Sequence, residues 1–237
     1  MLDTFAGIGG FSYAATKLVG GYRTTQFIEI DPFCQKILKK HFPFTPIHDD
    51  IRTFTAIPGQ YDVICGGFPC QSISVAGNRA GITEESRSGI FYELMRVIRM
   101  VRPRFVVLEN VAAILNNGLD IVLGELSQAG YDAEWSVISA SSLGACHRRS
   151  RWWCVAYPNG KRLQRQNFRK MEREIWAEGN TRRLDPDWRS YVSKPILPRG
   201  SHGLSNRVDR TKALGNSVVP QVAAIPLKRV HDLYYNE

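Results

Sequence analysis

The residue of this sequence best suited to nucleophilic chemistry is a cysteine that follows a glycine-rich strand end. Cys70 ends the run Gly-Gly-Phe-Pro-Cys, which begins at Gly66 and follows an apolar stretch. In open α/β sheets, the carboxyl ends of the strands border the crevice where ligands bind. Residues 71–89 continue with polar, serine- and glycine-containing sequence typical of a loop or lid. Since a lone cysteine is more often a small core residue, Cys70 needs other chemical groups nearby.

A carboxylate and two arginines could complete such a site. Glu109 follows the apolar run Val-Val-Leu, so we expect it at the same sheet edge as Cys70. Partial burial would raise the pKa of Glu109 and suit it to general-acid catalysis, whereas the alternatives are a helix cap or an arginine partner. We expect Arg149 and Arg151 on one face of a strand, where burying them without an anion or a polar ligand would be costly.

The first expected strand ends in a turn with glycines at positions 7, 9 and 10. Glycines between a strand and a helix let a ligand approach the backbone amides, although such turns also serve tight packing. Ser12 occupies the third glycine position of the dinucleotide fingerprint, which disfavours a nicotinamide cofactor. Glu29, at the next strand end, suits the two hydroxyls of a ribose. Together these features indicate a cofactor that contains a nucleoside.

The elements that position these residues alternate between short apolar strands and amphipathic helices, which is typical of βαβ units and a mainly parallel sheet. We expect strands over residues 2–5, 24–30, 61–65, 105–109, 133–139 and 152–157. We expect helices over residues 33–41, 88–102, 119–129 and 218–235. An α/β domain is therefore predicted, interrupted after residue 158 by polar sequence.

Charge is concentrated in that polar part of the chain. The net charge is +9, and residues 147–210 hold 16 Lys and Arg against 6 Asp and Glu. Residues 159–205 are rich in arginine and broken by prolines and glycines, so they have too little apolar surface for a core of their own. The cationic segment is either a solvated surface or a face that binds a polyanion such as nucleic acid.

Composition excludes several other classes. With 237 residues, 43% of them hydrophobic and 22% charged, the chain fits one globular α/β domain with a modest insert. No apolar run approaches the roughly 20 residues that span a bilayer, and no secretory signal is visible. Five cysteines without CxxC spacing predict neither a disulfide framework nor a zinc site. We therefore expect a cytoplasmic protein without a metal.

Taken together, the motifs resemble those of the cytosine-5 DNA methyltransferases, which use S-adenosylmethionine, over nearly all of the chain except 159–205. The matching residues, in the family's order, are Phe5, Gly7 and Gly9; Glu29; Asp50 and Ile51; Pro69, Cys70 and Gln71; Glu109, Asn110 and Val111; Arg149 and Arg151; and the run Leu-Gly-Asn-Ser-Val from Leu214. The resemblance implies a class I methyltransferase fold, Rossmann-like, with a mostly parallel seven-stranded sheet. The catalytic domain would comprise residues 1–158 and 206–237, and residues 159–205 would form a small Arg-rich target-recognition insert.

The resemblance also implies roles. The Cys70 thiolate would attack C6 of a flipped cytosine, Glu109 would protonate or hydrogen-bond N3, Arg151 would hold the O2 edge, and Arg149 would help fix the base or the loop 71–88. For the cofactor, Phe5, Gly7 and Gly9 would contact the methionine part, Glu29 the ribose, Asp50 the adenine amino group and Asn216 the carboxylate, with Ile30 packing on adenine and Ile51 in the turn after Asp50. The implied partner is double-stranded DNA, bound by a monomer.

The chain departs from the family pattern in two places. His147 stands where a glutamine usually precedes the arginine pair, and the arginine-rich motif before Leu214 is not recognisable. The insert is also shorter than a typical target-recognition domain, as in compact phage and prophage members, with readout expected on residues 161–199. One rival hypothesis is a tRNA cytosine-5 methyltransferase. A second is an inactive DNA-binding regulator of the same fold, and the presence of Cys70, Glu109 and Arg151 disfavours this second rival. A nicotinamide oxidoreductase is a more distant rival.

Overall fold

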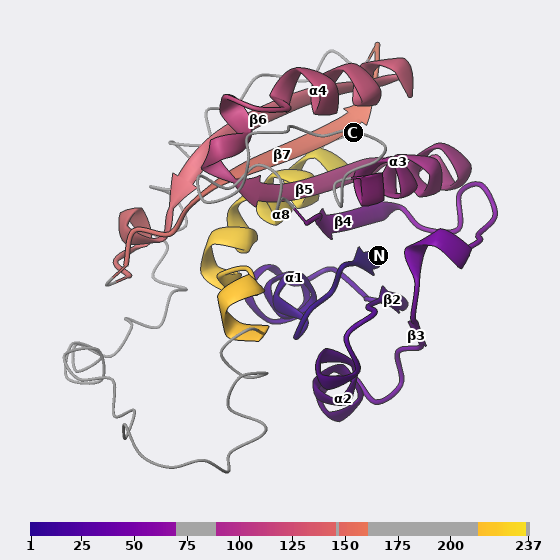
Figure 1. Ribbon diagram of the computed structural model, residues 1–237, viewed down its shortest axis with the longest axis vertical. Helices are drawn as coiled ribbons and strands as arrows, with labels where there is room; N and C mark the ends of the chain where they lie inside the picture. The colour runs from indigo at the N-terminus through magenta and orange to yellow at the C-terminus, as the bar shows by residue number, and fades with distance from the viewer. Residues whose placement is uncertain (70–88, 146, 161–212, 236–237) are drawn as a thin grey trace.

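The computed structural model describes residues 1–69, 89–145, 147–160 and 213–235. Within these ranges seven strands form one sheet in the order β3-β2-β1-β4-β5-β7-β6 (Figure 1). The strands are β1 (Leu2–Thr4), β2 (Gln26–Ile28), β3 (Ile47–His48), β4 (Val63–Gly67), β5 (Phe105–Val111), β6 (Tyr131–Ser139) and β7 (Ser150–Pro158). The first five strands in this order, from β3 across the sheet to β5, pair in parallel. β7 lies between β5 and β6 and runs antiparallel to both. The predicted mostly parallel, seven-stranded sheet is confirmed.

Helices cover both faces of this sheet. They are α1 (Gly10–Tyr13), which continues into the π-helical segment Ala14–Val19, α2 (Pro32–His41), α3 (Ile90–Val101), α4 (Leu119–Gln128) and α8 (Pro220–Tyr235). One apolar core contains residues of α3 and α4, and a second contains residues of α1 and α8, which lie against each other in Figure 1. Trp152 and Trp153 belong to different cores because successive residues of a strand point to opposite faces.

Strand register alone brings the chemistry-bearing residues to one edge. Gly67 pairs with Glu109 at the carboxyl ends of β4 and β5. Since β7 is antiparallel to β5, its beginning lies at this same edge, where Arg151 pairs with Val111. The carboxyl ends of β1 and β2 follow farther along, with Thr4 opposite Ile28.

Several sequence expectations need correction. β2 is shorter than the expected strand 24–30, and β6 and β7 each begin two residues earlier than expected. β3 was not predicted, because two residues carry no periodic pattern. β5 continues past Glu109 to Val111, and β4 begins two residues later than expected. Arg149 precedes β7 and has a φ of 30°, so the expectation that it shares a strand face with Arg151 is wrong.

Two other predictions concern residues that lie largely outside the described ranges. The predicted insert 159–205 lies outside them except for its first two residues, and so does the loop 71–88. In the part of the chain that the structure describes, no helix combines the length and the apolar character needed to cross a bilayer.

Candidate active site

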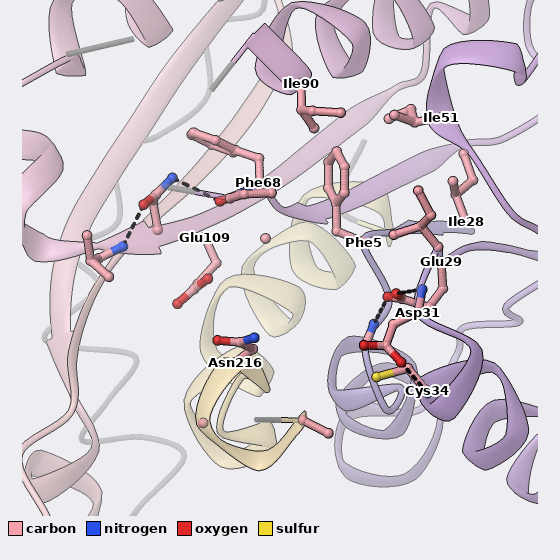
Figure 2. A pocket seen from close by; sticks show the side chains of 18 of the residues that line it. Phe5, Ile28, Glu29, Asp31, Cys34, Ile51, Phe68, Ile90, Glu109 and Asn216 are labelled. Atoms are coloured by element: carbon pink, nitrogen blue, oxygen red, sulfur yellow. Dashed lines mark hydrogen bonds between the residues drawn. The ribbon is translucent and has the colours of Figure 1, made fainter. Parts of the chain in front are cut away.

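A cleft of about 570 Å³ opens along the carboxyl edge of the sheet. This volume is within the usual range of about 300–1,000 Å³ for small-molecule sites. Figure 2 shows Glu109 and Asn216 toward one end of this cleft, and Glu29 and Asp31 toward the other. Most of the site residues predicted from the sequence line it: Phe5, Gly7, Glu29, Ile30, Asp50, Ile51, Glu109, Arg149, Arg151 and Asn216. The edge therefore brings ten predicted residues together.

Two predicted residues are not among these. Gly9 has a φ of 88°, and a Cβ there would lie 2.8 Å from Cε2 of Phe42 and 3.1 Å from Cδ2 of Leu38. Its glycine thus serves the packing of the turn on α2 rather than the lining of the cleft. Cys70 lies outside the described residues, but Pro69, directly before it, lines the cleft.

Glu109 is a buried carboxylate of the cleft, with 8% of its surface exposed. Burial raises the pKa of Glu109 to about 7, and the positive charges of Arg151 and then Arg149 oppose this rise. The Nε atom of Arg151 lies 3.1 Å from Oε1 of Glu109. A carboxyl group that titrates near neutrality can donate a proton and can also accept one, which suits acid–base catalysis.

The strand beside Glu109 leaves little space for a larger residue at Gly67. A Cβ at Gly67 would lie 3.1 Å from Oε2 of Glu109, closer than ordinary van der Waals contact. The glycine therefore sets where the carboxylate lies.

The opposite end of the cleft contains a second carboxylate held by backbone amides. Oε2 of Glu29 accepts from the amide of Gly7 at 2.6 Å, and Oε1 accepts from the amide of Asp31 at 2.7 Å. Burial raises the pKa of Glu29, and these hydrogen bonds lower it. Since each carboxylate oxygen has two lone pairs, Glu29 can still accept hydrogen bonds from a pair of vicinal hydroxyls.

Apolar and polar groups beside Glu29 would suit a planar base. Ile30 lines the cleft with 63% of its surface exposed, an apolar side chain open to a ligand. Asp50 caps the turn Ile51–Thr53, and its carboxylate also pairs with Arg52, 2.6 Å from Nη2 to Oδ2. This pairing lowers the pKa of Asp50. An amino group bound by Asp50 would therefore share the carboxylate with Arg52.

Sequence reasoning assigned no site role to Asn110, which is almost fully buried. Its Nδ2 donates to the carbonyl oxygen of Phe68 at 3.3 Å, and its Oδ1 accepts from the amide of Val111 at 2.8 Å. Asn110 thus fixes the backbone that leads through Pro69 toward Cys70. Its place in the Glu-Asn-Val motif was the available signal. Phe68 and Ile90 also line the cleft. Their place there could not be predicted from the sequence, because apolar residues of this kind are common in cores.

Comparisons with known proteins agree with this geometry. The family profile described as C-5 cytosine-specific DNA methylase matches residues 1–195. The Type II methyltransferase M.CviJI of Paramecium bursaria Chlorella virus IL3A is 37% identical over 158 residues, 65% of this chain and 42% of that protein. The Type II methyltransferase M.MspI of Moraxella sp is 32% identical over 162 residues, 67% of this chain and 38% of that protein. The chain spans less than half the length of these two relatives.

A solved structure shows the same fold. The crystal structure of the S. pombe Dnmt2 methyltransferase superposes with a TM-score of 0.57 and 23% sequence identity, over 69% of this chain and 52% of that one.

Proposed function

The chain belongs to the C-5 cytosine-specific DNA methylase family, and we propose that it transfers a methyl group from S-adenosylmethionine to C5 of a cytosine in double-stranded DNA. One observation carries the proposal. A buried carboxyl group that titrates near neutrality, Glu109, pairs with Arg151 at one end of a cleft whose other end contains Glu29. The two ends suit a pyrimidine and a nucleoside cofactor, respectively.

The base would react at the Glu109 end. Cytosine C5 is a weak nucleophile, so the Cys70 thiolate first adds to C6 and forms a carbon–sulfur bond. Neutral Glu109 gives its proton to N3, or hydrogen-bonds it, so that negative charge does not build up on the ring. The Arg151 guanidinium stabilises charge on the O2 edge. C5 then accepts the methyl group, and a base removes the C5 proton. The carbon–sulfur bond breaks as the C5–C6 double bond re-forms, and any proton that N3 received returns to Glu109.

The nucleoside part of the cofactor would occupy the Glu29 end, and its amino-acid part would extend toward Asn216 (Figure 2). S-adenosylmethionine supplies an electrophilic methyl group carried by a sulfonium. The Glu29 carboxylate accepts from the ribose hydroxyls, the exposed side chain of Ile30 packs on the adenine ring, and Asp50 accepts from the adenine amino group. Phe5, Gly7 and Ile51 line the same part of the cleft, and the Asn216 side chain binds the amino-acid carboxylate of the cofactor.

The partner and location follow from this chemistry. A cytosine inside a duplex must be flipped out of the stack to reach Glu109, and basic residues of the 161–199 region would neutralise phosphates. We further propose that the protein acts as a monomer in the cytoplasm, a reducing compartment in which the buried thiols of Cys65 and Cys154 would stay free.

The test is transfer of labelled methyl groups from S-adenosylmethionine by the purified full-length chain. We expect incorporation into duplex DNA, a covalent adduct with duplexes that contain 5-fluorocytosine, and neither product with Cys70→Ala. Bisulfite sequencing of DNA from cells that express the chain would identify the target context. Incorporation of labelled methyl groups into tRNA and not into DNA would mean that tRNA is the substrate. Binding of DNA without any transfer or adduct would contradict the enzymatic function.

A further inference from the structure

Arg149 is held by the segment that precedes α8, and not by strand β7. Its Nη2 donates to the carbonyl oxygen of Gly215 at 2.9 Å and to that of Ser217 at 2.5 Å. The backbone of Arg149 has a φ of 30°, on the positive side that non-glycine residues adopt only at an energetic cost. Such a conformation persists where surrounding contacts fix it, and these two hydrogen bonds are such contacts.

The same segment packs closely on the glycine turn. A Cβ at Gly10 would lie 2.6 Å from Cγ2 of Val218, 3.1 Å from its carbonyl oxygen and 3.3 Å from Oγ of Ser217. Only glycine at position 10 allows this approach. Ser217 therefore contacts both Arg149 and the glycine turn, while Asn216, directly before it, lines the cleft.

Charge connects Arg149 to Arg151 and Glu109. Burial lowers the pKa of Arg149, the charge of Arg151 lowers it further, and Glu109 raises it. Its Nε is buried and has no hydrogen-bond partner among the described residues. A half-buried cation beside another cation is unfavourable unless acceptors compensate it, and the carbonyl oxygens of Gly215 and Ser217 do so.

We propose that Arg149 is a positioning residue that fixes Asn216 in the cleft, so that cofactor binding depends on the arginine turn ahead of β7. Sequence reasoning gave Arg149 the task of fixing the base or the loop, whereas its hydrogen bonds in the structure go to the segment around Asn216. Arg151 faces Glu109 and serves the base end. The inference rests on the proposed function, because that function assigns Asn216 to the cofactor.

Three variants of the full-length chain test this role: Arg149→Met removes the donors, Arg149→Lys retains a charged donor, and Arg151→Met is the matched control. We expect Arg149→Met to weaken S-adenosylmethionine binding about tenfold in titration calorimetry and to speed amide hydrogen exchange over residues 215–218. Arg149→Lys recovers most of both properties, because its ammonium can donate to a carbonyl oxygen. Arg151→Met binds the cofactor within about twofold of the wild-type affinity.

Wild-type cofactor affinity in Arg149→Met overturns the proposal, as does weaker binding with unchanged exchange over residues 215–218. If the wild-type chain does not bind S-adenosylmethionine, the proposed function fails. The exchange measurement then still decides whether Arg149 holds the segment, since unchanged exchange would refute that contact. If Arg149→Met does not fold, Arg149→Leu, which also lacks a donor, replaces it, and wild-type affinity and exchange in that variant overturn the proposal.

Discussion

The guanidinium of Arg151 reaches the carboxylate of Glu109 diagonally across the antiparallel pair of β7 and β5, with Nε 3.1 Å from Oε1. Arg151 stands opposite Val111, two residues beyond Glu109, so the two side chains are diagonal neighbours on one face. The ion pair favours the ionised carboxylate, and burial favours the neutral acid. Burial is the larger effect, because the pKa of Glu109 is raised to about 7. Glu109 therefore changes protonation state near neutral pH.

Replacing Glu109 by glutamine should remove a pH dependence. The neutral acid donates to N3, so wild-type activity falls as the pH rises through about 7. Glu109→Gln loses this descending limb and about 10²-fold in rate, the usual contribution of a positioned acid. Initial rates of methyl transfer across this pH range check the prediction. The same descending limb in Glu109→Gln would assign it to another group.

The pH dependence of the free energy of unfolding should also change in Glu109→Gln. The pKa of Glu109 in the folded protein, about 7, is above the ordinary value of 4.5. Its stabilising contribution is therefore fully present below pH 4.5 and is lost as the pH rises through about 7. Denaturant unfolding should show a shallower loss of stability over this window in Glu109→Gln than in wild type. Equal slopes would mean that Glu109 ionises alike in both states.

Replacing Arg151 by methionine should shift the descending limb of the pH–rate profile. Since the charge of Arg151 lowers the pKa of Glu109, Arg151→Met raises that pKa and shifts the descending limb to higher pH. We also expect a loss of about 10- to 100-fold in the rate of adduct formation, as one hydrogen bond to developing charge is lost. The rate of 5-fluorocytosine adduct formation as a function of pH measures both effects. Arg99→Met, which removes a partner of Glu125 at the surface, is the control and should leave the limb in place.

The glycine beside Glu109 should be needed for activity more than for folding. A methyl group at position 67 would lie 3.1 Å from Oε2 of Glu109, so Gly67→Ala must displace the carboxylate by a few tenths of an ångström. We expect about a tenfold lower rate, because catalysis is sensitive to small misplacements. In contrast, nothing lies within 4 Å of a Cβ at Gly124 in α4, and alanine there should stabilise the helix by roughly 0.5–1 kcal/mol. Rates and urea unfolding of both variants test this difference, and equal rates would refute it.

The long elements could be predicted from the sequence because both faces of the sheet are covered. Central strands then read as continuous apolar runs, and the one-sided pattern before Pro103 marks α3 to within two residues. The two-residue β3 has no such pattern. At the site, Glu109 and Glu29 were predictable because carboxyl ends of parallel strands meet at one edge. The partners of Arg149 were not, since Gly215 is 66 residues away and a φ of 30° is invisible in residue spacing.

Glycine shows a second limit of sequence reasoning. Gly7 and Gly9 are equivalent in the motif, yet Gly7 donates its amide to Glu29 and lines the cleft, whereas Gly9 makes room for Phe42. Which glycine serves the ligand depends on the side chain of Phe42, which follows α2 more than thirty positions later. Spacing alone does not contain that contact.

Truncating the exposed isoleucine of the cleft should weaken cofactor binding without a cost in stability. Ile30 is 63% exposed, so Ile30→Ala removes little surface that folding buries, and the free energy of unfolding should change by less than about 0.5 kcal/mol. If the adenine ring covers about half of the surface of the three carbon groups that are lost, at about 0.8 kcal/mol for each fully buried group, cofactor binding should be roughly fivefold to tenfold weaker. Ile57 is the matched control, because it is 69% exposed and does not line the cleft. Titration calorimetry with S-adenosylmethionine and urea unfolding of Ile30→Ala and Ile57→Ala separate the two effects. Equal affinities in these variants would place the adenine away from Ile30 and contradict the assignment of this end of the cleft.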